Sequence, residues 1–158
     1  FAAADADAAF SCITPSLTRF MSWAPPASRD EFAAVWRAWL PKIDDGSDYV
    51  FAIRQRDDRQ FLGLAGLHHA ASNSPELGIW IREDRHGAGF GSEAVRLVVQ
   101  WASQVLAVDH FIYPVAEHNH PSRRIAESLG GVIMRRHPTP KYASVTYRIP
   151  QQSELAQR

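Results

Sequence analysis

The sequence predicts an α/β fold built on a mixed, mostly antiparallel sheet, and three observations support it. Residues 76–105 have the pattern of a strand, a glycine-rich loop and a helix in direct succession. A further strand at 111–116 follows that helix, and two strands joined by a crossover helix run parallel. Two hairpins, at 49–69 and 132–149, supply the antiparallel remainder.

The N-terminal part is expected to be mainly helical. Residues 2–10 are rich in alanine and predict a short helix, whereas the prolines and aromatic residues of 14–26 indicate an ordered loop. Ser28 followed by Glu31 is a capping box, from which an apolar stripe extends to Pro41, where we expect the helix to stop. The stripe consists of Phe32, Val35, Trp36, Trp39 and Leu40.

Strand signals dominate the middle of the chain. Residues 42–48 are expected to form a turn, followed by two antiparallel strands at 49–54 and 61–69 that flank a charged turn. Residues 70–75 turn into a central strand at 76–82, where large apolar residues occupy every second position.

The C-terminal part closes the sheet. Residues 132–136 and 144–149 predict a hairpin, and residues 151–158 predict a polar tail. We expect residues 1–150 to form one domain, because a chain of 158 residues can bury roughly 70% of the surface that it exposes when unfolded.

Composition excludes several classes of protein. A single cysteine, Cys12, rules out a disulfide framework or a cysteine metal cluster, and suits the reducing cytoplasm. Seventeen basic and 17 acidic residues cancel, so no global field attracts nucleic acid or an acidic membrane. The apolar runs are far shorter than a membrane span. We therefore expect a cytoplasmic protein with neither nucleic acid nor a membrane as partner.

The glycine-rich loop predicts an anion site. Gly87, Gly89 and Gly91 allow the backbone to approach a ligand closely, and they precede a helix expected from Ser92 onward. The N-terminus of such a helix carries roughly half a positive charge and favours phosphate. The loop is not a P-loop, since Gly91 is followed by Ser92-Glu93 without a lysine. It is not a dinucleotide fingerprint either, because its strand is not the first and its glycine spacing differs.

The loop does resemble a known motif. His86-Gly-Ala-Gly-Phe-Gly91 is similar to motif A of the GNAT superfamily of acetyltransferases, Gln/Arg-x-x-Gly-x-Gly/Ala, with histidine in the first place. The Ser92-Glu93-Ala94 that follows is similar to the branch that acetylates the N-termini of ribosomal proteins, the Rim type.

A second block about 30 residues downstream strengthens the resemblance. The segment 119–131 resembles motif B of the same superfamily, Asn-x-x-Ser/Ala followed by a helix that ends in Leu-Gly-Phe, with Asn119 and Ser122 in the named places. It departs twice from the family pattern. Ala126 stands where many members have a tyrosine that protonates the leaving thiolate, and Gly131 replaces the phenylalanine.

The resemblance implies a GNAT-like sheet with a parallel, splayed strand pair, acetyl-CoA as cosubstrate and a first strand upstream of Phe1. The pyrophosphate of coenzyme A is expected on the glycine loop, and its pantetheine arm along the central strand. Asn119 could hydrogen-bond that arm, cap the helix, or do both. The implied coenzyme contacts are Ile79, Trp80, Ile81, His86, Gly87, Ala88, Gly89, Phe90, Gly91, Ser92, Asn119 and Arg124.

Direct attack of an amine on the acetyl group requires a base and an acid. Glu76, at the start of the central strand, is the predicted base; alternatively it only pairs with a neighbouring charge. Ser122 is the predicted acid, as in the Rim-type branch; alternatively it only satisfies amides of the first helical turn. A main-chain N–H near residues 79–81 is expected to stabilise the oxyanion.

Three residues are expected to contact the acceptor. Trp23 and Tyr142 lie in predicted loops, where binding residues concentrate. His68 lies on the strand next to Glu76 and could serve as the base instead. No metal is expected, because the seven histidines include no set with a third ligand at a recognisable spacing.

We therefore expect an acetyl-CoA-dependent N-acetyltransferase that acts on a primary amine. An α-amine, of a protein N-terminus or a small amino compound, is favoured because deprotonating it at pH 7 costs about 1 to 1.4 kcal/mol, against about 4 to 5 for a lysine-like amine. An antibiotic or polyamine acetyltransferase is an alternative, although loops 22–26 and 137–142 lack the carboxylates a polycation needs. A catalytically silent acyl-CoA-binding module that regulates a partner is another, motivated by Ala126.

Overall fold

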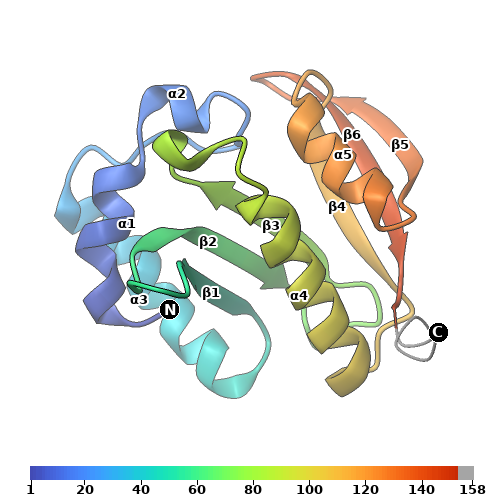
Figure 1. Cartoon of the computed structure of the whole chain (residues 1–158), viewed down its shortest axis with the longest axis horizontal. Helices are drawn as coiled ribbons and strands as arrows, with labels where there is room; N and C mark the ends of the chain where they lie inside the picture. Colours follow the sequence, from blue (N-terminus) through green and yellow to red (C-terminus); the bar gives the residue numbers. More distant parts are fainter. Residues whose placement is uncertain (153–158) are drawn as a thin grey trace.

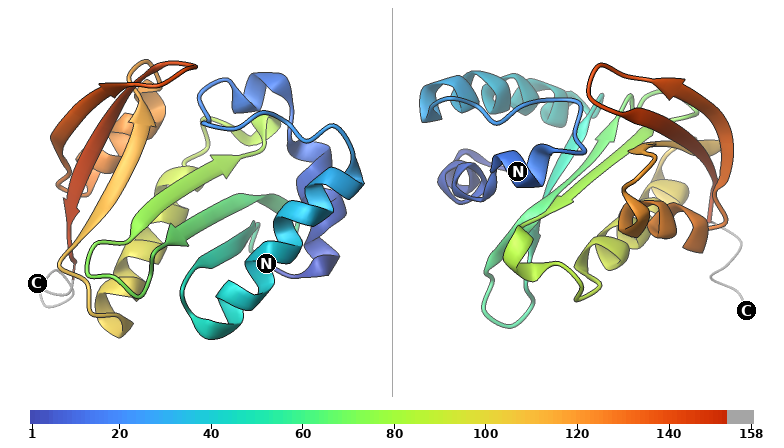
Figure 2. Two further views of the ribbon diagram at one scale, coloured as in Figure 1. Left: turned by 180° about the vertical axis from the view of Figure 1, so that it is seen from behind. Right: turned by 90° about the horizontal axis from the view of Figure 1, so that it is seen from above.

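The computed structural model describes residues 1–152 of the chain, so most of the predicted tail at 151–158 lies outside the described residues. Six strands form one sheet in the order β1-β2-β3-β4-β6-β5. The N-terminal helices cover one face of this sheet, and α4 and α5 cover the other (Figures 1 and 2). Within the described part of the chain, no helix combines the length and the apolar character needed to cross a membrane.

The first half of the chain begins with helices, and helices then lie between the strands from β3 to β5. The helical elements are η1 (Ala3–Asp5), α1 (Ala6–Cys12), α2 (Pro15–Thr18), α3 (Arg29–Asp45), η2 (Glu83–Arg85), α4 (Phe90–Val105) and α5 (His120–Ser128). The strands are β1 (Tyr49–Arg54), β2 (Phe61–His68), β3 (Glu76–Ile81), β4 (His110–Ala116), β5 (Val132–Pro138) and β6 (Ala143–Pro150).

Helix α3 is longer than its sequence predicts. Ser28 caps it as expected, accepting a hydrogen bond from the Glu31 N–H, but the helix does not stop at Pro41. It continues through the predicted turn to Asp45 and ends at Gly46, which has a φ of 75°. Proline removes one helical hydrogen bond, and Pro41 is exposed, so water can satisfy the carbonyl that this bond would have used.

The structure differs from the predicted helices at two further places. The expected loop at 14–26 contains the single-turn helix α2, in which Thr14 accepts a hydrogen bond from the Leu17 N–H and Pro15 takes the first position. Helix α4 begins at Phe90 instead of Ser92, because Gly89, with a φ of 82°, is its N-cap.

The sheet has the mixed pairing that the sequence predicts. All neighbouring strands are antiparallel except β3 and β4, which run parallel. These two are paired at a single position, Glu76 with Ile112, and then separate. The predicted fold class, including a splayed parallel pair, is therefore confirmed.

Two apolar clusters hold the layers together. One lies between the sheet and α4, where Val95, Val99 and Ala102 are fully buried against β2, β3 and β4. The other lies on the opposite face, where Phe32 of α3 packs with residues such as Trp80 of β3. Strand β3 is thus covered on both faces, while its edge toward β4 is open beyond Glu76.

Candidate active site

The splay leaves part of the β3 backbone without a strand partner. The Arg82 N–H donates to the Leu62 carbonyl at 2.8 Å, so it points toward β2. Backbone groups alternate in direction along a strand, and those of Ile79 and Ile81 therefore point toward β4. Since β4 pairs only at Glu76, this edge has the N–H groups of Ile79 and Ile81 and the Ile79 C=O available to an extended ligand, whereas the Ile81 C=O bonds His86.

The glycine loop lies at the end of this open edge. Gly87 and Gly89 have φ values of 79° and 82°, which only glycine adopts without strain, and a Cβ on either would meet no atom within 4 Å. The first α4 bond joins the Glu93 N–H to the Gly89 carbonyl at 3.0 Å. The preceding amides, from Phe90 to Ser92, have no partner within residues 1–152 and stand at an exposed helix N-terminus. This arrangement fits a pyrophosphate.

His86 contributes its ring as well as its backbone. The imidazole Nε2 lies 2.6 Å from the Ile81 carbonyl oxygen, and because a carbonyl only accepts, Nε2 is the protonated nitrogen. The ring thus ties the loop to the strand beside the splay. The sequence predicts His86 as a coenzyme contact but does not predict this bond of its ring.

Gly91 brings three elements together. A Cβ on Gly91 would lie 3.4 Å from Ile125 of α5, 3.6 Å from Ile81 and 4.0 Å from Ile79. The side chains of Ile79 and Ile81 therefore lie under the first turn of α4. Their backbone edge and the loop amides can consequently contact one continuous ligand.

The start of α5 faces the same splay. Asn119 is the N-cap, and its Oδ1 accepts a hydrogen bond from the Ser122 N–H at 3.4 Å. Ser122 Oγ lies 2.6 Å from the Tyr113 hydroxyl of β4. Burial raises the pKa of Tyr113 to about 12, so this phenol stays protonated. The predicted acid therefore has a hydroxyl partner that the sequence motifs do not predict.

The strand pattern contains the signal for Tyr113. Phe111, Tyr113 and Val115 alternate along β4 and are all buried. Side chains at every second position share one face, so a tyrosine at 113 points to the layer that holds α5. The family pattern predicts a tyrosine only on the helix, where this chain has Ala126.

The two arginines of α5 differ in their surroundings. Arg123 donates from Nε to the Tyr147 hydroxyl at 2.9 Å and from a terminal nitrogen to the Glu117 carbonyl at 3.0 Å. It therefore joins α5 to β6. Arg124 is exposed and has no side-chain partner in the described part of the chain, which leaves it available to a phosphate.

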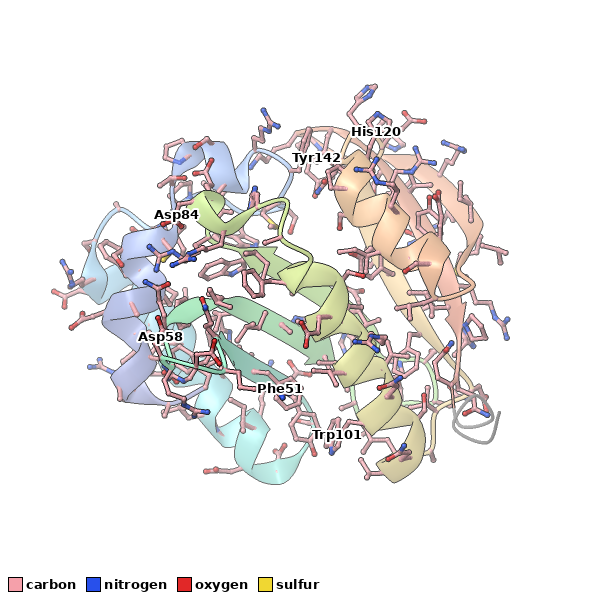
Figure 3. All side chains as sticks on the ribbon, in the orientation of Figure 1. Phe51, Asp58, Asp84, Trp101, His120 and Tyr142 are labelled. Atoms are coloured by element: carbon pink, nitrogen blue, oxygen red, sulfur yellow. The ribbon has the colours of Figure 1, made fainter. Side chains whose placement is uncertain are left out.

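A cavity of about 470 Å³ lies on the opposite face of β3, between the sheet and α3. Its lining includes Gly78 and Trp80 of β3, together with Trp23 and His68, two of the three predicted acceptor contacts. Tyr142, the third, does not line it: Tyr142 lies in the turn between β5 and β6, at the upper rim in Figure 3. Burial raises the pKa of Tyr142.

Glu76 and His68 occupy opposite positions on β3 and β2. Such cross-strand neighbours share a face of the sheet, and here it is the face of the cavity, because Glu76 alternates with Gly78 and Trp80. The Glu76 carboxylate has no hydrogen-bond partner among residues 1–152.

His68 is oriented by Asp48. Its Nδ1 lies 3.3 Å from Asp48 Oδ2, while Asp48 Oδ1 accepts a hydrogen bond from the His69 N–H at 2.8 Å. Partial burial opposes ionisation of Asp48, but these hydrogen bonds and the nearby Lys42 outweigh it and lower its pKa. The opposite ring nitrogen, Nε2, lies over Gly66, where a Cβ would approach it to 2.7 Å.

A second cavity has little overlap with the predicted site residues. A larger cavity of about 600 Å³ lies under α4 beside β1, and of the predicted residues only Phe90 lines it. Phe51 and Trp101, which also line it, lie near the C-terminal end of α4, away from the glycine loop (Figure 3). Among the described residues, no group of three or more His, Cys, Asp or Glu side chains could hold a metal ion.

Comparison with known proteins identifies the fold and the family. Residues 1–132 match the family model described as an acetyltransferase (GNAT) domain. A crystal structure of spermidine N-acetyltransferase from Vibrio cholerae, in complex with CoA and spermine, is 17% identical with a TM-score of 0.81, covering 96% of this chain and 92% of that one.

Two further structures are related to ribosomal-protein acetylation. A putative ribosomal-protein-serine acetyltransferase from Vibrio cholerae is 19% identical with a TM-score of 0.79, covering 95% of this chain and 90% of that one. RimL, a ribosomal L7/L12 α-N-protein acetyltransferase, is 14% identical with a TM-score of 0.79, covering 93% and 85%. The match over residues 1–132, more than half of the chain, shows that this protein belongs to the GNAT acetyltransferases, the enzymes that transfer an acetyl group from acetyl-CoA.

Proposed function

We propose that the protein acetylates the α-amine of a protein N-terminus or of a small amino compound, by direct attack in a ternary complex. One observation carries this proposal. The same strand, β3, lines the cavity on one face through Gly78 and Trp80, and offers its open edge to the glycine loop through Ile79 and Ile81. Two substrates held on this strand would meet at the splay.

The transfer itself uses groups of β3 and α5. The amine nitrogen attacks the thioester carbon, and an N–H of Ile79 or Ile81 on the open edge donates to the oxygen that becomes negative. As the C–S bond breaks, Ser122 donates its proton to the departing sulfur and regains a proton from solvent before the next turnover, while the Tyr113 hydroxyl, 2.6 Å away, hydrogen-bonds Ser122 Oγ.

The amine must lose a proton before or during the attack. Glu76 is the proposed base, because its carboxylate is on the cavity face and is free of any partner in residues 1–152. His68, opposite Glu76, is the second possible base. An α-amine suits either group, since its pKa of about 7.7 to 8.0 leaves a useful neutral fraction at pH 7.

The structure of the cavity argues against the polyamine alternative, despite the similarity to a spermidine acetyltransferase. Of the described residues in the lining, Glu31 alone carries a carboxylate, so a polycation would find a single negative charge there. A polycation is normally bound by several free carboxylates. The alternative of a catalytically silent acyl-CoA-binding module was motivated by Ala126 in the place of the family tyrosine. This argument is weaker, because Tyr113 supplies a phenol beside Ser122.

We also place the reaction in the cytoplasm, which contains acetyl-CoA and whose reducing conditions suit a single free thiol such as Cys12.

The test is acetyl transfer to two versions of one short peptide, with a free or a formylated N-terminus. Mass spectrometry should find one added acetyl group on the free α-amine, and release of free CoA should match it. Glu76→Gln and Ser122→Ala should each lower kcat by about 100-fold. Acetylation of a lysine side chain in the formylated peptide at an equal rate would contradict α-amine specificity, and full activity in both variants would contradict the two roles.

A further inference from the structure

The acceptor cavity is lined almost entirely by apolar side chains. Phe32 of α3, Leu64 of β2 and Trp80 of β3 form its floor and are each less than 10% exposed. Trp23, in the loop before α3, and Val35, on α3, stand at its mouth and are 39% and 46% exposed. Exposed large apolar residues around a concave site of this size are typical of a site for an apolar ligand group.

Glu31 and His68 are the ionisable side chains among the described residues that line the cavity. Glu31 of α3 accepts a hydrogen bond from the Ala27 N–H through Oε2 and is the one carboxylate among the described residues of the lining. His68 lies at the opposite end, over Gly66, and its Nε2 is 4.0 Å from the position of a Cβ on Gly78. The two glycines leave room for the imidazole and bring it to β3, on the same face as Glu76.

The charged groups around His68 come from three elements. Asp48, before β1, faces Nδ1, and Lys42 of α3 lies 3.8 Å from the same carboxylate. Glu76 of β3 is directly opposite in register. We therefore assign the amino group of the acceptor to this end of the cavity, and an apolar group to the region lined by Trp23, Val35 and Trp80.

We propose that the acceptor is a primary α-amine that carries a large apolar side chain on the adjacent carbon. This inference deepens the proposed function and rests on it. The amino group lies at the Gly66, Gly78 and His68 end, beside the splay, and the side chain fills the space between Trp23, Val35 and Trp80. The ligand chemistry is shared by free aromatic amino compounds and by peptides that begin with an aromatic residue.

The test compares acceptors that differ only in this side chain. With saturating acetyl-CoA, kcat/KM for phenylalaninamide should exceed that for glycinamide by at least tenfold, and spermidine should be slower than both. Tetrapeptides that begin with Phe or with Gly form the second arm. A preference for Phe in the peptides as well would indicate a protein N-terminus as the source, and a preference only in the amides would indicate a free small molecule.

A charge introduced at the mouth tests the site itself. Val35→Glu places a carboxylate at an exposed position of the lining, and should lower kcat/KM for phenylalaninamide at least fivefold while raising that for spermidine. Ala34→Glu is the matched control, because Ala34 is exposed on the same helix and does not line the cavity; it should change neither value. Equal effects of the two variants would overturn the proposed location.

Binding separates this inference from the proposed function. Calorimetric titration of CoA-saturated protein with phenylalaninamide and glycinamide measures the cavity without any turnover. Tighter binding of phenylalaninamide without acetylation would support the cavity and contradict the proposed function. Acetylation of both amides with equal kcat/KM and equal affinity would overturn the inference and leave the proposed function standing.

Discussion

The Tyr113 hydroxyl lies 2.6 Å from Ser122 Oγ and joins the middle of β4 to the first turn of α5. Because burial raises the pKa of Tyr113 to about 12, the phenol remains a donor at any pH near neutrality. If the phenol is the donor in this hydrogen bond, the serine proton is left free for another acceptor. We propose that this pair, from a strand and a helix together, takes the part of the tyrosine that stands on the helix in the family pattern.

Removing either hydroxyl should slow the transfer. We expect Ser122→Ala to lower kcat by about 100-fold and Tyr113→Phe by about tenfold, since the serine alone can still donate. The affinity for acetyl-CoA should stay within threefold of the wild type in both. Steady-state kinetics and calorimetry provide the two readouts.

Tyr147→Phe is the control for these variants. It also deletes a buried hydroxyl, which bonds Arg123 and Glu127 and lies on β6, next to β4. It should cost about 1 kcal/mol of unfolding free energy without changing kcat. A loss of kcat as large as that of Tyr113→Phe would mean that the effect arises from packing.

Gly89→Ala should weaken coenzyme binding. Gly89 has a φ of 82° and open space around it, so the effect of the methyl group is to force the backbone out of the left-handed region. Reorienting the loop amides should raise the Kd for acetyl-CoA at least tenfold in a calorimetric titration.

Gly130→Ala separates backbone strain from ligand binding. Gly130 has a φ of 80° and follows α5, away from the loop. Gly130→Ala should lower the unfolding free energy by about 1 to 2 kcal/mol, as we also expect for Gly89→Ala, because both force a left-handed backbone on alanine. It should nevertheless bind acetyl-CoA as the wild type does. Equal loss of affinity in both variants would contradict the assignment of the cradle.

Asp48→Asn should destabilise the protein in a pH-dependent manner. The pKa of Asp48 in the folded state is lowered, so its contribution to stability is present above its ordinary pKa of 3.8 and is lost as the pH falls through the lowered value. Urea unfolding should show a deficit of about 1 kcal/mol at pH 7 that shrinks toward zero below about pH 4. Asp44→Asn, at an exposed position of α3 without a side-chain partner in residues 1–152, should show no such trend.

Lys141→Met should loosen the acceptor side of the site. Lys141 lies in the turn between β5 and β6, and its Nζ donates to the Thr18 carbonyl at 2.8 Å and the Trp23 carbonyl at 3.1 Å. Without these bonds the segment that carries Trp23 is less well held. We expect the KM for the amine to rise three- to tenfold, with the Kd for acetyl-CoA unchanged.

Arg135→Met removes a comparable cation from the exposed strand β5, where Arg135 has no side-chain partner among the described residues. It should leave both constants as they are. If Lys141→Met also leaves the KM for the amine unchanged, the bridge between the two loops has no part in acceptor binding.

Local patterns predicted the strands well. Alternation gave the bounds of β3 to within a residue, and the crossover rule gave the parallel direction of β4. Helix ends were less predictable, because Pro41 disfavours a helix locally and yet α3 continues through it to the left-handed Gly46. The register of β3 and β4, and hence the position of the splay, depends on long-range pairing that no local pattern contains.

The parts of the candidate site that lie within a sequence motif could be predicted from the sequence. The glycine loop and the cap at Asn119 follow from short-range patterns, and both are observed. The pairs Tyr113 with Ser122 and Asp48 with His68 join different elements, 9 and 20 residues apart, so only the packed structure shows them. The same holds for Lys141 and Trp23, which are 118 residues apart.

The most direct test of the central claim is a thermal-shift titration with acetyl-CoA, with ATP as the nucleotide control. At a hundredfold excess over its Kd, a specific ligand stabilises the fold by about 2.7 kcal/mol, which for a chain of this size raises the Tm by about 5 to 11 °C. We predict a saturable rise of this size for acetyl-CoA and none for ATP. Equal shifts for both ligands, or no shift in folded protein, would contradict the assignment of the glycine loop and the β3 edge as the acetyl-CoA site.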